Sequence, residues 1–84
     1  MKLGKKLKEN RVRKQMTQQD LADKLLVSRS TISNWESDRS YPDLEALKEL
    51  SQIFATSIDD LLLDDSELIK KMSKDMKKGK HRKK

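Results

Sequence analysis

The segment SRSTISNWE, residues 28–36, concentrates hydroxyl, amide and guanidinium groups in one short run. At about 100° per residue of an α-helix, Ile32, Trp35 and Glu36 gather on one side. The opposite side carries Arg29, Ser30, Ser33, Asn34 and Ser37. These groups donate and accept hydrogen bonds, and most of them sit on short side chains. The spacing therefore predicts a polar helix face that fits closely against a hydrogen-bonding partner.

The sequence offers few residues suited to covalent catalysis or metal binding. The chain has no Cys, and its one His, His81, lies among basic residues near the C-terminal end. No nucleophile is paired with a base. The acidic stretch of Asp59, Asp60, Asp64 and Asp65 lacks the ligand spacing of a cation-binding loop, so we interpret it as helix caps and a solvated turn. We therefore expect no enzymatic activity, no metal and no cofactor.

The composition limits the size and kind of fold. Of the 84 residues, 40% are charged and 33% are hydrophobic, so we expect one small domain with a thin helical core. Neither a secretory signal nor an apolar run of about 20 residues is evident. Together with the lack of Cys, these features favour a cytoplasmic protein without a membrane span.

Five helices are predicted over residues 2–63. The first, residues 2–14, places Leu3, Leu7 and Arg11 on one face, so Arg11 points where a core residue should lie. The second begins after Thr17, which has the spacing of a capping box with Asp20. Its inner face is apolar and includes a small alanine, which would let a neighbouring helix come close.

A tight break at Leu26 and Val27 separates the second predicted helix from the third. The third, fourth and fifth predicted helices cover residues 28–37, 44–54 and 57–63. Each is preceded or begun by a residue suited to helix capping, namely Ser28, Asp43 and Ser57.

The C-terminal part of the chain is amphipathic and then strongly basic. Leu68, Ile69 and Met72 follow helical spacing, which predicts an amphipathic helix over residues 64–78. Residues 79–84 are predicted to form a disordered basic tail. The net charge is +6, whereas residues 71–84 alone carry +7. A solvated tail is one interpretation of this charge, and binding to phosphates or to a protein partner is the other.

Two helices joined by a tight turn, the second with a polar outer face, are the components of a helix-turn-helix. The major groove of B-DNA, about 12 Å wide, admits one helix when the facing side chains are short. Ser30, Ser33 and Asn34 suit contacts with bases, and Arg29 can donate two hydrogen bonds to O6 and N7 of guanine. A solvated helix face is the alternative, but such faces usually carry Glu and Lys.

Residues 17–62 resemble the Xre family of helix-turn-helix regulators, which includes the lambdoid phage repressors and Cro proteins. The segment reads TQQDLADKLLVSRSTISNWESDRSYPDLEALKELSQIFATSIDDLL, and the whole resemblance covers residues 3–63. It implies an all-α fold: a five-helix lambda-repressor-like DNA-binding domain over residues 1–63, here followed by the amphipathic helix and the basic tail. Members usually bind operator DNA as two-fold dimers.

The resemblance also implies roles for individual residues. Base-contacting positions are matched by Ser28, Arg29, Ser30 and Asn34. Phosphate-contacting positions are matched by Thr17, Gln18 and Arg39, of which Gln18 also braces the recognition helix. Arg11 and Glu36 match a pair that forms an internal salt bridge in several members. Leu26 departs from the family, which most often has a left-handed Gly there, and a branched side chain is expected to cost about 1 kcal/mol.

Our main hypothesis is a sequence-specific transcriptional regulator, a repressor that binds a palindromic operator in double-stranded DNA as a homodimer. The residues predicted to join the subunits are Leu62, Leu63, Leu68 and Met72. One alternative is an antitoxin-like protein that neutralises a protein partner through its C-terminal segment and autoregulates through the same DNA-binding domain. Another is nonspecific nucleic-acid binding by the basic tail.

Overall fold

Every regular element within residues 1–80 is an α-helix, which confirms the predicted all-α class. The computed structural model describes the backbone of residues 1–80 and the side chains of residues 1–75. Its helices, in chain order, are α1 (Leu3–Arg13), α2 (Gln18–Leu25), α3 (Arg29–Glu36), α4 (Leu44–Phe54), α5 (Ile58–Leu62) and α6 (Ser66–Lys80). None of these helices combines the length and the apolar composition needed to cross a membrane.

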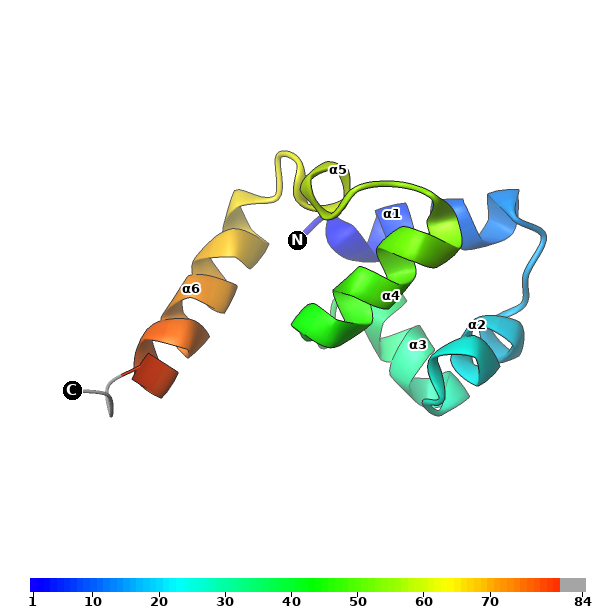
Figure 1. Ribbon diagram of the computed structural model, residues 1–84, viewed down its shortest axis with the longest axis horizontal. Coiled ribbons are helices and arrows are strands. Elements are labelled where there is room, and N and C mark those ends of the chain that lie inside the picture. The colour runs from blue at the N-terminus through cyan, green and yellow to red at the C-terminus, as the bar shows by residue number, and fades with distance from the viewer. Residues whose placement is uncertain (81–84) are drawn as a thin grey trace.

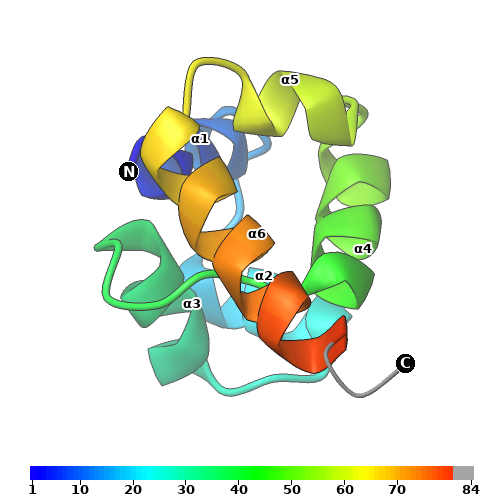
Figure 2. The ribbon, with the colours of Figure 1, turned by 90° about the vertical axis from the view of Figure 1, so that its left-hand side faces the viewer.

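Helices α1 to α5 surround one apolar core (Figure 1). The α2–α3 pair packs beneath α1, and α4 lies across from α1 and α3 (Figure 2). In the described part of the chain, the core consists of Trp35 and eleven aliphatic or aromatic side chains: Leu3, Leu7, Leu21, Ala22, Leu25, Ile32, Leu47, Leu50, Phe54, Leu61 and Leu68. Because Ile32 and Trp35 are both buried, the inner side of α3 is the side that the helical spacing predicted.

Local capping sets where most helices begin. The predicted capping box is present, because Asp20 donates its backbone N–H to the Thr17 hydroxyl at 3.0 Å and accepts from the Thr17 N–H at 2.9 Å. Hydrogen bonding from the Thr17 backbone lowers the pKa of the Asp20 carboxyl. The three other predicted capping residues each accept a backbone N–H from three residues ahead: Ser28, Asp43 and Ser57. These caps satisfy amides that have no partner inside the helix.

The turn between α2 and α3 has the left-handed conformation expected from the family pattern. Leu26 adopts φ 58° and ψ 44° at the end of α2. Its side chain is 91% exposed, so it gains no packing in return for the strained backbone. A left-handed residue with a Cβ costs about 1–2 kcal/mol. Closure of the turn is secured by Val27, whose N–H donates to the Ala22 carbonyl at 3.0 Å.

Gly4 lets α1 approach the C-terminal end of α3 at backbone distance. A Cβ atom at this position would lie 2.5 Å from the Glu36 carbonyl oxygen and 2.7 Å from that of Trp35. The Gly4 N–H also donates to the Asp38 carboxylate at 3.1 Å. Glycine within a helix costs about 0.5–1 kcal/mol relative to alanine. The close contact between α1 and α3 explains why a glycine occupies position 4. The helical periodicity of the sequence does not indicate this contact.

Asp65, in the link to α6, has the predicted capping role, because its Oδ1 accepts the N–H of Leu68 at 3.4 Å. It is buried rather than part of a solvated turn, which corrects that part of our interpretation. This side chain is 1% exposed, and its Oδ2 accepts the N–H groups of Lys2 at 2.8 Å and Leu3 at 2.7 Å. Its carboxylate therefore caps α1. The backbone carbonyl of the same residue accepts the N–H of Ile69 at 3.0 Å in the first turn of α6. A local sequence pattern contains no sign of a cap supplied from more than 60 residues away.

Helix α6 differs from the predicted C-terminal helix in extent and in its first buried contact. It spans Ser66–Lys80 instead of residues 64–78, so two residues of the predicted disordered tail are helical. The other four, residues 81–84, lie outside the described residues. Leu68 is fully buried in the core, so it has no surface to offer a second subunit, contrary to our prediction. Farther along α6, Met72 packs against the edge of the core, and the helix runs diagonally across one face of the domain (Figure 2).

Candidate nucleic-acid interface

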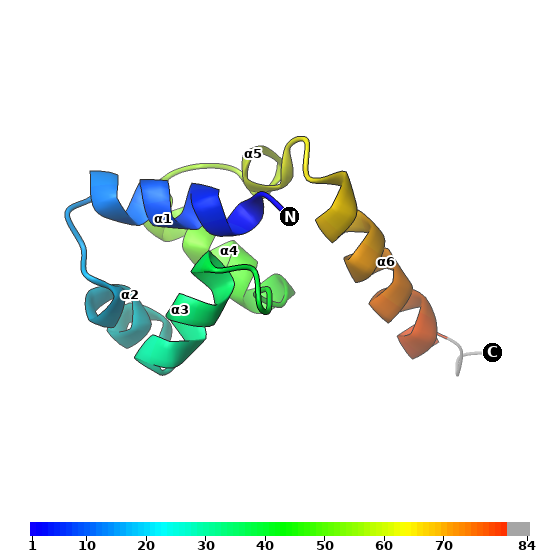
Figure 3. The ribbon, with the colours of Figure 1, turned by 180° about the vertical axis from the view of Figure 1, so that it is seen from behind.

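The outer face of α3 is open to solvent at its N-terminal end. Ser28, Arg29 and Ser30 are exposed, whereas Ser33 and Asn34 are half-buried. The inner face of the same helix is closed by Ile32 and Trp35. Viewed from behind, α2 and α3 form one corner of the molecule, far from α6 (Figure 3). The structure therefore places the five predicted base-contacting residues along α3 and its N-cap, and the first three of them are exposed.

The hydroxyl groups at the start of α3 are organised by capping. Ser28 Oγ accepts the N–H of Thr31 at 3.1 Å, and it lies 3.0 Å from Ser30 Oγ and 2.9 Å from Thr31 Oγ1. Ser28 is therefore partly committed to the helix that it caps. Our prediction did not include Thr31, which completes this cluster. Its spacing three residues after a cap would have been the only signal in the sequence.

The predicted phosphate-contacting residues lie at the start of α2 and just after α3. Gln18, at the start of α2, accepts a hydrogen bond through Oε1 from the Arg29 guanidinium at 3.2 Å. The neighbouring Thr17 is held in its capping box. At the other end, Arg39 is exposed, and its backbone N–H donates to the carbonyl of Asn34 at 2.9 Å. Gln18 and Arg39 therefore both lie close to α3, whereas Thr17 contacts Asp20 within α2.

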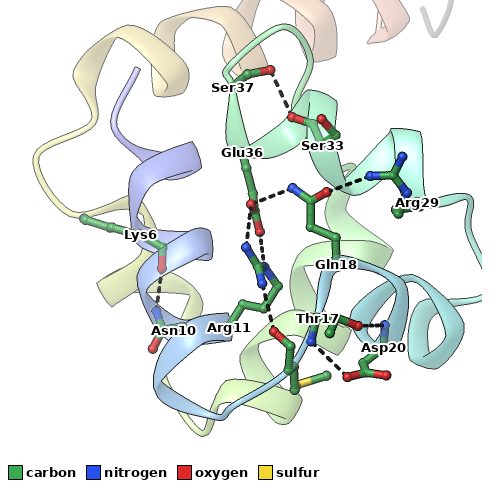
Figure 4. Close-up of polar contacts among 11 residues, drawn as sticks. Lys6, Asn10, Arg11, Thr17, Gln18, Asp20, Arg29, Ser33, Glu36 and Ser37 are labelled. Carbon is green, nitrogen blue, oxygen red and sulfur yellow. Dashed lines mark hydrogen bonds and ion pairs between the residues drawn. The ribbon is translucent and has the colours of Figure 1, made fainter.

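A nearly buried ion pair connects α1 to α3. Arg11 Nε donates to Glu36 Oε2 at 2.7 Å, and the terminal nitrogen Nη2 donates to Oε1 at 3.2 Å (Figure 4). The Arg11 side chain is 11% exposed and that of Glu36 is 5% exposed. Arg11 Nη1 also donates to the carbonyl of Met16 at 2.8 Å. The structure thus brings together the two residues that we predicted to pair.

Gln18 joins this ion pair to the outer face of α3. Its Nε2 donates to Glu36 Oε1 at 3.1 Å, while its Oε1 accepts from Arg29 (Figure 4). Consequently, Arg11, Glu36, Gln18 and Arg29 form one continuous series of hydrogen bonds from the interior to the surface. The Arg11–Glu36 pair and a bracing role for Gln18 were predicted, whereas the hydrogen bonds that join Gln18 to Glu36 and to Arg29 were not.

Comparison with known proteins places this arrangement in a family. Residues 7–61 match the family described as Helix-turn-helix. The chain belongs to the helix-turn-helix family. Its membership confirms the resemblance on which we based the fold, with α2 and α3 as the helix-turn-helix pair.

Two known transcriptional regulators are similar in sequence to this helix-turn-helix chain. The HTH-type transcriptional activator BcrR of Enterococcus faecalis is 47% identical over 62 residues, which make up 74% of this chain and 30% of that protein. The HTH-type transcriptional regulator ImmR of Bacillus subtilis (strain 168) is 41% identical over 76 residues, 90% of this chain and 59% of the relative. The chain therefore spans less than two thirds of the length of either relative.

A second surface of this helix-turn-helix protein is apolar. A groove of about 420 Å³ lies among α4, α5 and α6, and its apolar lining consists of Leu44, Leu47, Ile58, Leu62 and Met72. Leu44 is exposed because it lies at the open edge of this groove. Tyr41 donates its hydroxyl to Asp75 across the groove, and this hydrogen bond raises the pKa of the phenol.

Proposed function

We propose that this chain binds double-stranded DNA sequence-specifically and regulates transcription, as a homodimeric repressor on a palindromic operator. The observation that carries the proposal is the exposed outer face of α3, where Arg29 and short hydroxyl side chains stand clear of the core. The names of the two relatives, a transcriptional activator and a transcriptional regulator, support the same class of activity.

In this proposal α3 enters the major groove with its N-terminal end toward the bases. Arg29 donates to guanine, and Ser30, Ser33 and Asn34 make the shorter contacts. Gln18 retains a second amide hydrogen for a phosphate, because only one is used by Glu36. Arg39 supplies a positive charge at the far end of the helix. Phosphate contacts of this kind set the register, whereas base contacts set the sequence preference.

The dimer is proposed to form through the apolar surface around α5. Leu63 is 59% exposed directly after α5, and Leu62 and Met72 line the apolar groove beside it. Exposed apolar side chains that adjoin such a groove are typical of protein interfaces. Operator binding requires that the two α3 helices of such a dimer enter successive major grooves, about 34–36 Å apart.

Replacing Arg29 with Ala is expected to cost about 1–3 kcal/mol of binding free energy and to relax the preference at one base pair of each half-site. The measurement is a selection of preferred sites from random duplexes at physiological salt, followed by titration of the selected sites. Arg13→Ala is the matched control, because Arg13 is also exposed but lies on α1. If Arg29→Ala weakened binding equally on every sequence, Arg29 would be a phosphate contact instead.

Replacing Leu63 with Glu is expected to shift the dimer toward monomer and to weaken operator binding, because two like charges would meet at the interface. Sedimentation velocity across a concentration series measures the shift, and helical circular dichroism checks the fold. Val12→Glu is the control, since Val12 is also exposed and apolar but lies on α1. An unchanged self-association in Leu63→Glu would exclude this surface.

A further inference from the structure

The side-chain amide of Gln18 has one chemically permitted orientation. Its two neighbours are the Glu36 carboxylate, which at neutral pH only accepts hydrogen bonds, and the Arg29 guanidinium, which only donates them. The amide nitrogen therefore faces Glu36 at 3.1 Å, and the amide oxygen faces Arg29 at 3.2 Å. Both neighbours require the same orientation, so neither contact is made at the expense of the other.

Glu36 is itself held in place from the interior. Its carboxylate accepts two hydrogen bonds from Arg11, and its side chain is 5% exposed. Arg11 is further anchored by the Met16 carbonyl at 2.8 Å. Among the described residues, no buried side-chain nitrogen or oxygen lacks a hydrogen-bond partner. The acceptor presented to Gln18 is therefore fixed in position before any ligand binds.

From these contacts we propose that Glu36 is a positioning residue for Arg29, acting through the orientation of the Gln18 amide. The ion pair then does more than join α1 to α3. It directs the amide oxygen of Gln18 outward, and this oxygen holds the long Arg29 side chain beside the start of α3. This inference rests on the proposed function, because its consequence is the base preference of Arg29.

The physical consequence is a smaller entropy loss when Arg29 binds a base. A free arginine side chain loses much of its rotamer freedom on binding, whereas one that is already hydrogen-bonded loses less. The guanidinium has five N–H donors, and its contact with Gln18 uses one of them. Two adjacent donors can therefore still meet O6 and N7 of a guanine.

The test removes the Arg11–Glu36 ion pair without leaving either charge buried and unpaired. Arg11→Met combined with Glu36→Leu replaces the pair by apolar side chains, a change that proteins often tolerate without loss of stability. The readout is the ratio of affinities for the selected operator and for the same operator altered at the base pair that Arg29 contacts. This ratio is expected to fall about 2- to 12-fold, the effect of ordering one long side chain. Preference at other base pairs should stay unchanged.

A double-variant cycle separates positioning from a general effect on structure. In an Arg29→Ala background, removing the ion pair should change the base preference no further, because the side chain that it positions is absent. In the free protein, ¹⁵N relaxation of Arg29 Nε should report faster motion once the pair is gone. Preference and mobility that both remain unchanged in the folded double variant would overturn the proposal.

Gln18→Met keeps the test decisive if the double variant does not fold, because it leaves Arg11 and Glu36 paired. It should reduce the preference at the Arg29 base pair in addition to any uniform weakening, and Gln52→Met on α4 should do neither. Uniform weakening alone would overturn the proposal. A chain that shows no base preference at all would instead refute the proposed function, so the two failures are distinguishable.

Discussion

Replacing Glu36 with Ala is expected to lower the free energy of unfolding by about 3–5 kcal/mol. The reason is that the Arg11 guanidinium would remain in the interior without its counter-charge. Arg11 would lose the hydrogen bonds that it makes to both Glu36 oxygens while its side chain remained largely removed from solvent. A nearly buried cation without a counter-charge is far more costly than the loss of a surface ion pair.

Chemical denaturation measures this loss, and thermal melting should show a fall of about 10 °C or more for a domain of this size. Glu49→Ala is the control, because Glu49 is exposed on α4. Arg11→Met combined with Glu36→Leu should recover most of the stability. A melting temperature unchanged by Glu36→Ala would show that Arg11 finds another partner or reaches water, and would contradict a structural role for the pair.

Replacing Leu68 with Ala is expected to cost about 2–5 kcal/mol of folding stability. Leu68 lies in the first turn of α6 and has no exposed surface, because it packs into the same core as α1 and α5. Truncation would remove buried methyl groups and leave a cavity. This prediction also tests whether the chain after residue 63 is an appendage or a part of the folded unit.

The matched comparison is Leu26→Ala, which makes the same chemical change at a side chain that is 91% exposed. Its expected effect on the unfolding free energy is within about 0.5 kcal/mol, the usual range for surface positions. Urea denaturation of both variants gives the difference directly. Equal effects of the two substitutions would mean that Leu68 is not packed in the core in solution.

Local features of the fold were predictable because their causes lie within a few residues. A capping hydroxyl bonds to an amide three residues ahead, so Thr17 and Ser28 identify helix starts without any knowledge of the tertiary structure. The inner side of α3 follows from helical geometry, which puts Ile32 and Trp35 on one face. The left-handed turn at Leu26 required the family resemblance, because leucine has no intrinsic preference for that conformation.

The polar outer face of α3 could be predicted in the same way. The hydrogen bonds that link this face through Gln18 to the buried Glu36 could not. Nothing in the spacing of residues 18 and 29 indicates that one amide oxygen meets one guanidinium. That contact depends on the angle between α2 and α3, which the packing of the whole core determines. The same holds for Gly4, whose need for a small side chain arises from the backbone of α3.

By itself, the sequence determined an all-α helix-turn-helix chain, its helix starts and the polar side of α3, because capping and helical periodicity act over short separations. Only the tertiary structure decided that Asp65 caps α1, that Leu68 completes the core, and that Glu36 reaches Arg29 through Gln18. Each of these depends on groups far apart in the chain, whose distance is set by the joint packing of all the helices.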